Sequence, residues 1–314
     1  MYRFLPAPVL GALTFLAICL NTILVSIPYF TIALVKFVVP VAAWRHFWTR
    51  PLVWFAEGWI RVNNLILDAT QPTRWDFRGL DDPRLSRKGR YLVTSNHQTW
   101  SDVMVLQRLL IGHVPFLRFF IKQELIWVPI LGLAWWAADM PFMKRYSKAK
   151  LARRPELAGK DLETTRRACE HFRRGPISIM NFIEGTRFTR SKHDSQQSPY
   201  VHLLKPKAGG VAAVLDALSG ELDTIVNVTI VYPGRQPSFW DFLSGRIPRV
   251  LCEVNVEDIP ADLCGRDYTA DDIHRERMQI WIRELWAQKD RRFSALEAQA
   301  APADAASRKH RRAA

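Results

Sequence analysis

A histidine and an aspartate five positions apart are the first residues whose types could perform chemistry. His97 and Asp102 lie in the segment 95–102, which reads SNHQTWSD. An imidazole can take a proton from a substrate when a carboxylate holds its second ring nitrogen in one tautomer. A separation of five turns two side chains about 140° apart on an ideal helix. The pair can therefore meet only if His97 lies in a loop and Asp102 in the first turn of a helix.

The flanking sequence permits this arrangement. The β-branched run from Tyr91 to Thr94 predicts a strand before the histidine, and residues 103–110 have the periodicity of a helix. The spacing alone does not prove a pair, because a chain with this many histidines and aspartates contains such a spacing by chance. The alternative is that Asp102 only begins the helix and His97 is an ordinary loop residue.

A second segment has the residue types of a phosphate site. The sequence Glu184-Gly185-Thr186-Arg187 follows a predicted strand at residues 177–182. The glycine lets the backbone approach a ligand closely, and the threonine and arginine can donate hydrogen bonds to phosphate. An ordinary turn after the strand is the alternative.

A third segment is basic. The sequence Phe142-Met143-Lys144-Arg145 opens a stretch to residue 154 that has six Lys or Arg side chains and no acidic one. Such a surface attracts phosphate, although a solvated cationic face has the same composition.

The remaining elements predict the scaffold that must position these segments. Further strands are expected at residues 225–232 and 250–256, and helices at 161–172, 208–218 and 271–288. Strands that alternate with helices predict an α/β fold with a mixed sheet flanked by helices.

The start of the chain is apolar. Residues 4–35 carry no charged side chain, which exceeds the roughly 20 residues that a helix needs to cross a bilayer. Asn21 and Pro28 interrupt this stretch, so it could form one tilted span or two helices that enter and leave the same leaflet. A cleaved signal peptide fits poorly, because the apolar part is too long and Arg3 is the only charge before it.

Basic and aromatic residues follow the apolar stretch, as at the cytoplasmic boundary of a membrane. They are Lys36, Arg45, His46 and Arg50, with Trp44, Trp48 and Trp54 among them. A second apolar segment, at residues 125–138, predicts either a buried core helix or a surface dipped into the membrane interface. We therefore divide the chain into a membrane-embedded helical anchor at 1–55, an α/β domain at 56–297 and a flexible basic tail at 298–314.

Composition narrows the classes of function. Mean hydropathy is −0.08, too polar for a many-helix transporter, while 48% of the residues are hydrophobic, too many for a disordered chain. The net charge of +14 favours anionic partners such as nucleic acid, acidic lipid or phosphorylated substrates. The four cysteines are scattered without a C-x-x-C pair, which indicates neither a zinc site nor a disulfide framework and suits a reducing compartment.

The order and approximate spacing of these segments resemble the four conserved blocks of the glycerolipid acyltransferases, the 1-acylglycerol-3-phosphate acyltransferase family. The blocks correspond to Asn96-His97 through Asp102, to Phe142 through Arg145, to Phe182-x-Glu184-Gly185-Thr186-Arg187, and to the strand that ends at Pro233. The segment from Lys122 to Gly132 is similar to the family's link between its first two blocks. The resemblance covers roughly residues 75–233.

The resemblance implies a mechanism and the residues that perform it. His97 would be the general base and Asp102 would orient it. The glycerol phosphate of the acceptor would contact Asn96, Phe142, Arg145, Glu184, Gly185, Thr186 and Arg187. Neither a cofactor nor a metal is implied, and the chain has no G-x-S-x-G segment for a covalent acyl-enzyme.

The resemblance also implies substrates and a location. A fatty acyl group would move from acyl-CoA or acyl carrier protein to the hydroxyl of a lysophospholipid, with 1-acylglycerol-3-phosphate giving phosphatidic acid. Ile183 and Phe188 stand where phosphatidate-forming members commonly have Pro and Ser. In this respect the chain is more similar to a bacterial inner-membrane branch of acyltransferases and to some eukaryotic acylglycerophosphate enzymes. The bacterial branch implies a catalytic domain on the cytoplasmic side of that membrane.

Two alternatives stay open. The enzyme could remodel another lysophospholipid, since the departures bear on the acceptor. From a different class, a non-catalytic membrane-tethered protein could use its positive charge to hold acidic lipid or nucleic acid. The enzyme interpretation expects anionic membrane lipid, and no nucleic acid, as a partner.

Overall fold

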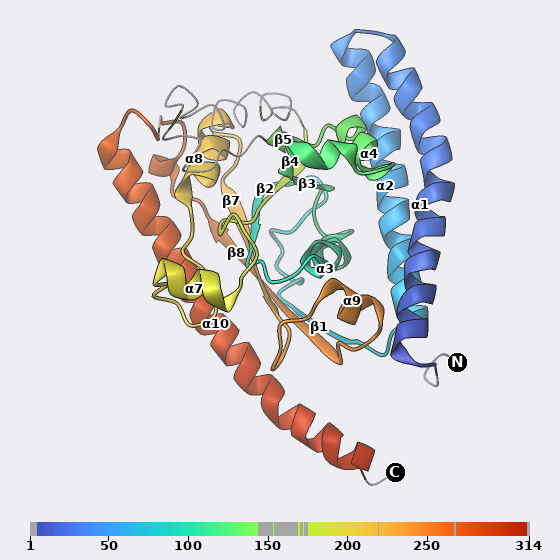
Figure 1. The fold of residues 1–314 in the computed structure, drawn as a ribbon. Helices are drawn as coiled ribbons and strands as arrows, with labels where there is room; N and C mark the ends of the chain where they lie inside the picture. Colours follow the sequence, from blue (N-terminus) through green and yellow to red (C-terminus); the bar gives the residue numbers. More distant parts are fainter. Residues whose placement is uncertain are drawn as a thin grey trace.

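The computed structural model describes residues 5–143, 175–218, 220–266 and 268–312, together with residues 153, 169 and 172, and the side chains as far as Ala300. A six-stranded sheet in the order β1-β8-β7-β2-β6-β3 forms its centre (Figure 1). The strands are β1 (Arg74–Arg78), β2 (Arg90–Ser95), β3 (Leu117–Phe119), β6 (Ile177–Asn181), β7 (Thr224–Val231) and β8 (Arg249–Asp258).

The sheet is mixed, as the sequence predicts. The pairs β1–β8, β7–β2, β2–β6 and β6–β3 are parallel, and β7–β8 is antiparallel. The central strands are apolar on both faces because both faces are covered. The carboxyl ends of β2, β6 and β7 consequently meet at one edge of the sheet, where ligands bind in open α/β sheets.

Helices cover the two faces of the sheet. On one face lie α8 (Ala208–Ala217) and α10 (Asp272–Arg312); on the other lie α3 (Ser101–Leu110) and α9 (Phe239–Leu243) (Figure 1). Three of the expected helices are thus present, and α10 continues well beyond the predicted end at 288, through the segment expected to be a tail. The fourth, at 161–172, lies outside the described residues except for 169 and 172.

The apolar segment 125–138 forms two short helices, η1 (Gln123–Trp127) and α4 (Leu131–Ala137), instead of one core helix. Ile130 has a positive φ of 65° between them, and a Cβ on Gly132 would lie 2.0 Å from the carbonyl oxygen of Ile126. A small parallel pair, β4 (Ile121–Lys122) with β5 (Phe142–Met143), flanks these helices. Trp127 is 86% exposed and Leu133 is 56% exposed, so this segment presents an apolar surface.

The chain begins with a helical hairpin. It consists of α1 (Ala7–Val38) and α2 (Ala42–Thr70), and α1 is long and apolar enough to cross a membrane. Polar side chains join the two helices internally: Asn21 Nδ2 donates to Asn63 Oδ1 at 2.8 Å, and Trp59 Nε1 donates to Thr22 Oγ1 at 3.0 Å.

The hairpin is fixed to the sheet domain near both ends of α1. Close to its start, Gly11 lies against Trp240 and Ser244, at and just after α9. Close to its end, Lys36 Nζ bonds both carboxylate oxygens of Asp139, at 2.8 and 2.7 Å. Lys36 is only 1% exposed, so it is an internal tie and not the headgroup-facing boundary residue that its sequence position suggested.

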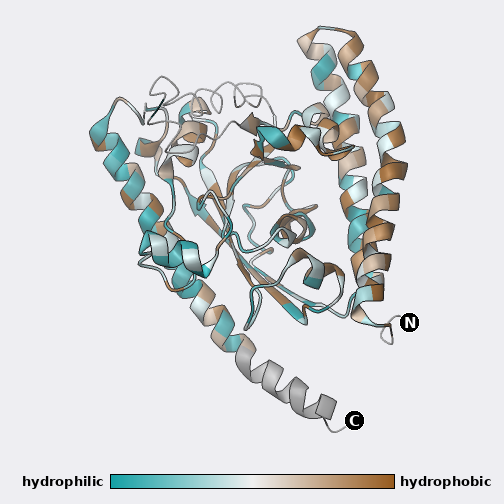
Figure 2. Cartoon of the chain, viewed as in Figure 1, coloured by the Kyte–Doolittle hydropathy of each residue, from teal (hydrophilic) through white to brown (hydrophobic). Residues whose placement is uncertain are grey.

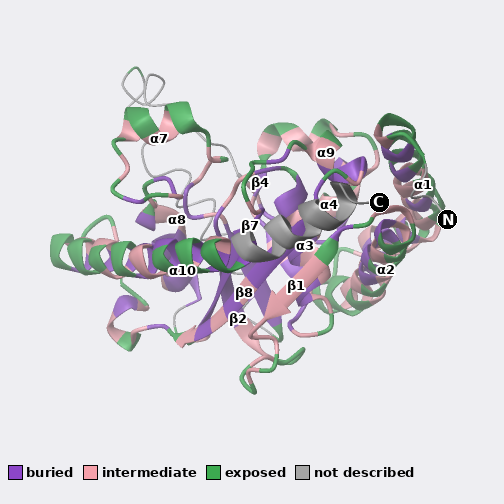
Figure 3. Cartoon of the chain, turned by 90° about the horizontal axis from the view of Figure 1, so that it is seen from below, coloured by how far each residue is buried: buried purple, intermediate pink, exposed green. Residues whose placement is uncertain are grey.

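The outward face of the hairpin is apolar. Figure 2 shows hydrophobic colour along α1, and the burial view in Figure 3 shows exposed residues on the same helix. The large exposed side chains of this helix are Val9, Leu13, Phe15, Leu16, Leu20, Ile23, Leu24, Ile27, Leu34 and Val38. An apolar surface of this extent is characteristic of contact with a membrane or a partner.

Candidate functional site

The structure brings His97 and Asp102 together at the carboxyl end of β2. His97 Nδ1 lies 2.9 Å from Asp102 Oδ2, with His97 in the loop after the strand and Asp102 in the first turn of α3. This is the placement that the spacing requires. The imidazole is 14% exposed and the carboxylate 1%, so the pair is buried on the side of the aspartate and open on the side of the histidine.

Four donors surround the Asp102 carboxylate. Oδ2 accepts from the backbone N–H groups of Gln98 at 2.6 Å and Thr99 at 2.9 Å, and Oδ1 accepts from the hydroxyl of Tyr232 at 2.8 Å. Since a carboxylate with these partners acts as an acceptor, His97 Nδ1 carries the proton of the shared bond. The other ring nitrogen, Nε2, is then the basic one and makes no hydrogen bond to the described residues.

Tyr232 directly follows β7, and the sequence alone indicated no role for it beyond the predicted strand. Burial and then the charge of Asp102 raise the pKa of its phenol well above the usual value. The phenol is therefore a hydrogen-bond donor at any ordinary pH. The signal that could have identified it is its position at the carboxyl end of a strand next to β2.

Aromatic and backbone contacts fix the orientation of the His97 ring. The ring stacks on Phe182 with centroids 4.0 Å apart and planes 17° apart. The backbone N–H of Phe188 donates to the carbonyl of His97 at 2.7 Å. Gln236 joins the loops that carry these residues, because its Nε2 donates to the carbonyls of Gln98 and Phe188. From the sequence, Phe182 was named only as the first residue of the third block, without a role, and Gln236 was not singled out.

Asn96 serves the scaffold in this structure. Its side-chain amide accepts from the N–H of Ile230 at 2.9 Å and donates to the carbonyl of the same residue at 2.8 Å. The side chain is 1% exposed. Asn96 thereby replaces a rung of the β2–β7 ladder where β2 ends and holds the His97 loop against β7.

The turn 184–187 follows β6 and lies beside the His97 loop. Gly185 has a positive φ of 71°, a conformation that favours glycine. Arg187 is exposed, and its guanidinium lies 4.6 Å from the centre of the Trp100 ring. Thr186 accepts a hydrogen bond at 2.8 Å from the Nζ of Lys192, which lies in α7 (Arg190–Gln196). A guanidinium and an ammonium group therefore lie on this turn, close to the loop of His97.

Glu184 points away from solvent. It is 1% exposed, and neither carboxylate oxygen has a hydrogen-bond partner among the described residues. Burial raises the pKa of Glu184 well above its usual value; the charge of Lys289 and the backbone N–H groups of Leu204 and His97 act in the opposite direction.

The second block is only partly described. Phe142 lies in β5 and packs against the same hydrophobic cluster as Phe182, while Arg145 lies outside the described residues. The position of the Arg145 side chain relative to His97 therefore stays a prediction of the sequence.

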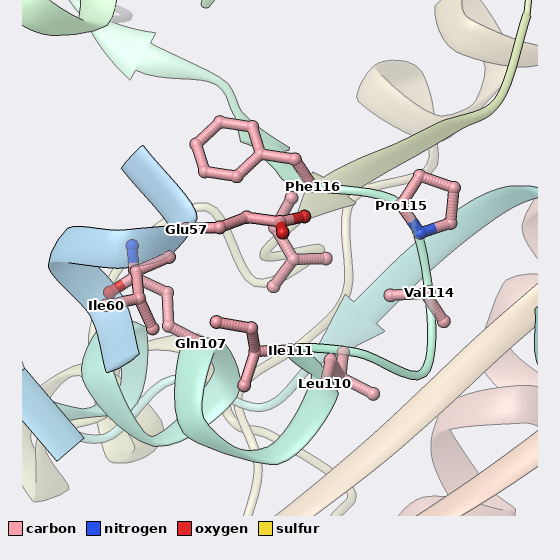
Figure 4. A pocket seen from close by; sticks show the side chains of 9 residues that line it. Glu57, Ile60, Gln107, Leu110, Ile111, Val114, Pro115 and Phe116 are labelled. Carbon is pink, nitrogen blue, oxygen red and sulfur yellow. The ribbon is translucent and has the colours of Figure 1, made fainter. Parts of the chain in front are cut away.

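Two hollows lie between the hairpin and α3. The first has about 290 Å³ of empty space that is open to solvent, and it is lined by α2, by the end of α3 and by the loop to β3, as Figure 4 shows for Glu57, Ile111 and Phe116. The second, of about 570 Å³, lies between the hairpin and α4 and is mainly apolar. The hollows share Ile60, Gln107 and Phe116 in their linings and therefore adjoin each other; we call the two together the seam. Phe119, three residues after Phe116, stacks on Phe182, which itself stacks on His97.

Within the described ranges, no group of three or more His, Cys, Asp or Glu side chains is arranged to hold a metal ion. The ionisable groups at the edge of the sheet instead form an acid–base pair beside a cationic turn.

Known proteins resemble the chain in sequence and in fold. It is 25% identical over 230 residues to the 1-acyl-sn-glycerol-3-phosphate acyltransferase epsilon of Mus musculus, which covers 65% of this chain and 57% of the relative. It is 26% identical over 231 residues to the delta enzyme of Rattus norvegicus, with 67% and 54% covered. The chain thus spans about half the length of the curated relatives it matches.

Among solved structures, the fold is similar to the 1-acyl-sn-glycerophosphate (LPA) acyltransferase PlsC of Thermotoga maritima. The TM-score is 0.51 at 15% identity, with 90% of this chain and 98% of that chain covered. The family model named Acyltransferase matches residues 77–233, half of the 314 residues, which include His97, Asp102 and the turn 184–187. This chain belongs to the acyltransferase family.

Proposed function

We propose that this protein transfers a fatty acyl group from a thioester to the free hydroxyl of 1-acylglycerol-3-phosphate, giving phosphatidic acid. The observation that carries the proposal is the His97–Asp102 pair beside the cationic turn of Arg187. Three further donors orient the aspartate, and Nε2 of the histidine makes no hydrogen bond to the described residues. The names of the relatives, which act on 1-acyl-sn-glycerol-3-phosphate, support the choice of acceptor.

The geometry supports a direct transfer. Nε2 of His97 takes the proton of the acceptor hydroxyl as its oxygen attacks the thioester carbonyl carbon. Asp102 stabilises the imidazolium that forms. The tetrahedral intermediate then collapses: the C–O bond stays, the C–S bond breaks, and the proton passes from Nε2 to the leaving sulfur. No group of the protein is acylated in this sequence of steps.

The cationic turn is suited to the phosphate of the acceptor. Arg187 stacks on Trp100, which orders the guanidinium, and no described residue accepts a hydrogen bond from its N–H groups, which can therefore bond phosphate oxygens. Lys192 adds a second positive charge from α7. Thr186 and the backbone of Gly185 complete a turn that a phosphate can approach closely, and Arg145 is expected to add to it from the second block. Glu184 lies on the inner side of this turn, with its carboxylate buried.

The seam between the hairpin and α3 is suited to an alkyl chain. Its apolar lining includes Val25, Phe116 and Leu131, and Phe116 lies three residues before Phe119, which stacks on Phe182 beside His97. The hollow of about 570 Å³ offers an acyl tail a mainly apolar lining. The acyl donor is acyl-CoA or acyl carrier protein, as a substrate and not as a bound cofactor.

We place the protein at the surface of a membrane, with bacterial inner membrane and a cytoplasmic catalytic domain as the expected setting. Both ends of α1 are fixed to the sheet domain although they lie roughly 37 Å apart along the helix. The hairpin therefore lies along the domain and does not extend away from it. This arrangement favours insertion of the apolar face into one leaflet, with anionic lipid attracted by the net charge of +14.

The test is acyl transfer by the purified full-length protein and by its His97→Ala variant. Lysophosphatidic acid and other lysophospholipids are offered with acyl-CoA or acyl carrier protein, and products are measured by mass. Loss of the base should lower kcat by about 10² to 10⁴-fold while folding and vesicle binding persist. His113→Ala, a histidine in the turn after α3, is the matched control and should retain activity.

Turnover of the His97→Ala variant at the wild-type rate would refute the role of His97. If products form only from another lysophospholipid, that lysophospholipid is the acceptor in place of 1-acylglycerol-3-phosphate. Absence of any product, together with binding to anionic vesicles that salt abolishes, would favour the non-catalytic alternative.

A further inference from the structure

A glutamine beyond the matched region contacts both loops of the candidate site. Gln236 lies three residues after the end of the family match, in the loop between β7 and α9. Its Nε2 donates to the carbonyl oxygen of Gln98 at 2.9 Å and to that of Phe188 at 2.7 Å. Both partners can only accept, so the amide nitrogen must face them, and its two N–H groups are both used. One side chain therefore bridges the two loops.

Each bridged carbonyl is next to a residue of the proposed chemistry. Gln98 directly follows the base His97, and Phe188 directly follows Arg187, the proposed partner of the phosphate. The two loops also meet directly, because the backbone N–H of Phe188 donates to the carbonyl of His97 at 2.7 Å. Gln236 thus adds two hydrogen bonds at the junction between the base and the cationic turn.

The turn that presents this glutamine is itself fixed. Gly234 has a positive φ of 67°, and the backbone N–H of Arg235 donates to the carbonyl of Tyr232 at 3.3 Å. The Arg235 guanidinium is held from α9 and the residues after it: Nη1 donates to the carbonyl of Arg246 at 3.0 Å, and Nη2 lies 3.3 Å from Asp241 Oδ2. The bridging amide is therefore anchored to the body of the domain.

The separation of the two loops bears on the reaction because the acceptor is held at two points. Its hydroxyl must reach Nε2 of His97, while its phosphate is held by Arg187 on a loop that follows a different strand. A displacement of about 1 Å between reacting groups can cost about 10²-fold in rate. The hydroxyl meets the base only when the distance between the loops matches the glycerol that joins hydroxyl and phosphate.

We propose that Gln236 is a positioning residue that sets the separation between the base and the phosphate-binding turn. An acceptor held by its phosphate then presents its hydroxyl to Nε2 of His97. This inference rests on the proposed function and deepens it, because it concerns how the same site selects an acceptor with a phosphate at a defined distance from the hydroxyl. It also extends the functional unit beyond residue 233.

The first measurement is steady-state acyl transfer. Gln236→Leu removes both donors with a side chain of similar size, and the residue is exposed, so folding should persist. We expect kcat/KM for lysophosphatidic acid to fall by about 10-fold, because the hydroxyl is no longer aligned, while KM for the thioester changes by less than about twofold. Gln299→Leu is the matched control: Gln299 is an exposed glutamine of α10 whose Oε1 accepts from Arg78, at the opposite edge of the sheet, and this variant should retain wild-type kcat/KM.

A double-mutant cycle separates positioning from a general structural effect. In the Arg187→Ala background the phosphate is no longer held at the turn, so the alignment of the turn with the base loses most of its value. The Gln236→Leu substitution should then cost less than about threefold in kcat/KM for the acceptor. An effect on stability alone would lower the rate equally in both backgrounds.

The second measurement does not depend on turnover. Amide hydrogen exchange, read by mass spectrometry on the full-length protein, reports how firmly segments 95–102 and 185–193 are held. Exchange in both segments should quicken by about fivefold or more in Gln236→Leu, since the bridge between them is lost. It should stay at the wild-type rate in Gln299→Leu.

Wild-type kcat/KM in Gln236→Leu would overturn the inference, as would an equal loss in both backgrounds or unchanged exchange in both segments. If Gln236→Leu does not fold, Gln236→Glu decides: an ionised carboxylate of the same shape cannot donate to either carbonyl and should show the same losses. A wild-type protein without acyl transfer would refute the proposed function and this role with it. Wild-type transfer with unchanged exchange in the Gln236 variant would refute the role alone.

Discussion

The hydrogen bond from Tyr232 to Asp102 allows a sharp test of how the base is oriented. Tyr232→Phe removes one hydroxyl and leaves the ring in place, so the carboxylate loses the only described donor to Oδ1 and keeps the three on Oδ2. A hydrogen bond to a charged group contributes about 1.5–3 kcal/mol to stability. Because three donors to the carboxylate remain, we expect the contribution of the Tyr232 bond to lie near the lower end of this range. We expect the free energy of unfolding to fall by about 1.5–2 kcal/mol, and Tm by about 3–8 °C.

The same bond steadies the aspartate as the imidazolium forms, so kcat should also fall, by about 10-fold. The KM values for both substrates should change by less than about twofold, because Tyr232 touches neither the turn of Arg187 nor the seam. The measurements are thermal unfolding and steady-state acyl transfer on the same preparations.

Tyr91→Phe is the matched control. Tyr91 is a buried residue of β2 whose hydroxyl donates to the carbonyl of Arg84 and accepts from the N–H of Ser86, at the opposite end of the sheet from His97. This variant should lose stability and keep its kcat. If Tyr232→Phe loses stability but retains wild-type kcat, as the control does, Tyr232 has no part in orienting the base and our reasoning about the aspartate is wrong.

Two further predictions concern the phosphate and the membrane. Arg187→Ala should raise KM for the phosphate-bearing acceptor by about 10- to 100-fold and leave KM for the thioester within about twofold, since a charge-assisted hydrogen bond is lost. The control is Arg190→Ala, which removes an exposed arginine of α7. If both variants raise the acceptor KM equally, Arg187 does not bind the phosphate. Trp127→Ala should weaken binding to anionic vesicles by about 10-fold in a sedimentation assay, since an 86% exposed indole near the hairpin loses its apolar contact. The control is Ile273→Ala, which changes an exposed residue at the start of α10 and should bind vesicles as the wild type does. If Trp127→Ala also binds as the wild type does, η1 does not contact the membrane.

Local hydrophobic patterns in the sequence predict most of the strands and helices of the fold. The central strands are β-branched runs buried on both faces, and α3 and α8 have the periodicity of helices, so their types follow from neighbouring residues. The edge strand β1 was missed because it has no β-branched residue and three charged ones, although Arg74-Trp75-Asp76-Phe77-Arg78 has the alternation of a half-buried strand. The break between η1 and α4 depends on the close approach of Gly132 to Ile126, which a hydropathy pattern does not reveal.

In the candidate site, too, some contacts follow from the local sequence and others depend on segments far apart in the chain. The pairing of His97 with Asp102 follows from five residues of chain, and the geometry of a helix already restricts it. The register of β7 on β2 decides that Tyr232 reaches Asp102, and the packing of α10 decides that Lys289 donates a hydrogen bond to the carbonyl of Val228 in β7. Lys36 was wrongly predicted to face lipid headgroups, because it follows an apolar run. Its partner Asp139 lies far along the chain, so the sequence around Lys36 does not reveal the ion pair.

The attachment of α1 to the domain at two distant points has a kinetic consequence. A protein held flat against one leaflet meets its lipid substrates by lateral diffusion in that leaflet, so the quantity that governs its rate is the number of acceptor molecules per unit area. Dilution of the acceptor with inert lipid at constant total acceptor would then slow the enzyme as effectively as removal of acceptor from the assay. In the arrangement we propose, the two-point attachment would make the composition of the surrounding lipid a control on flux through the enzyme.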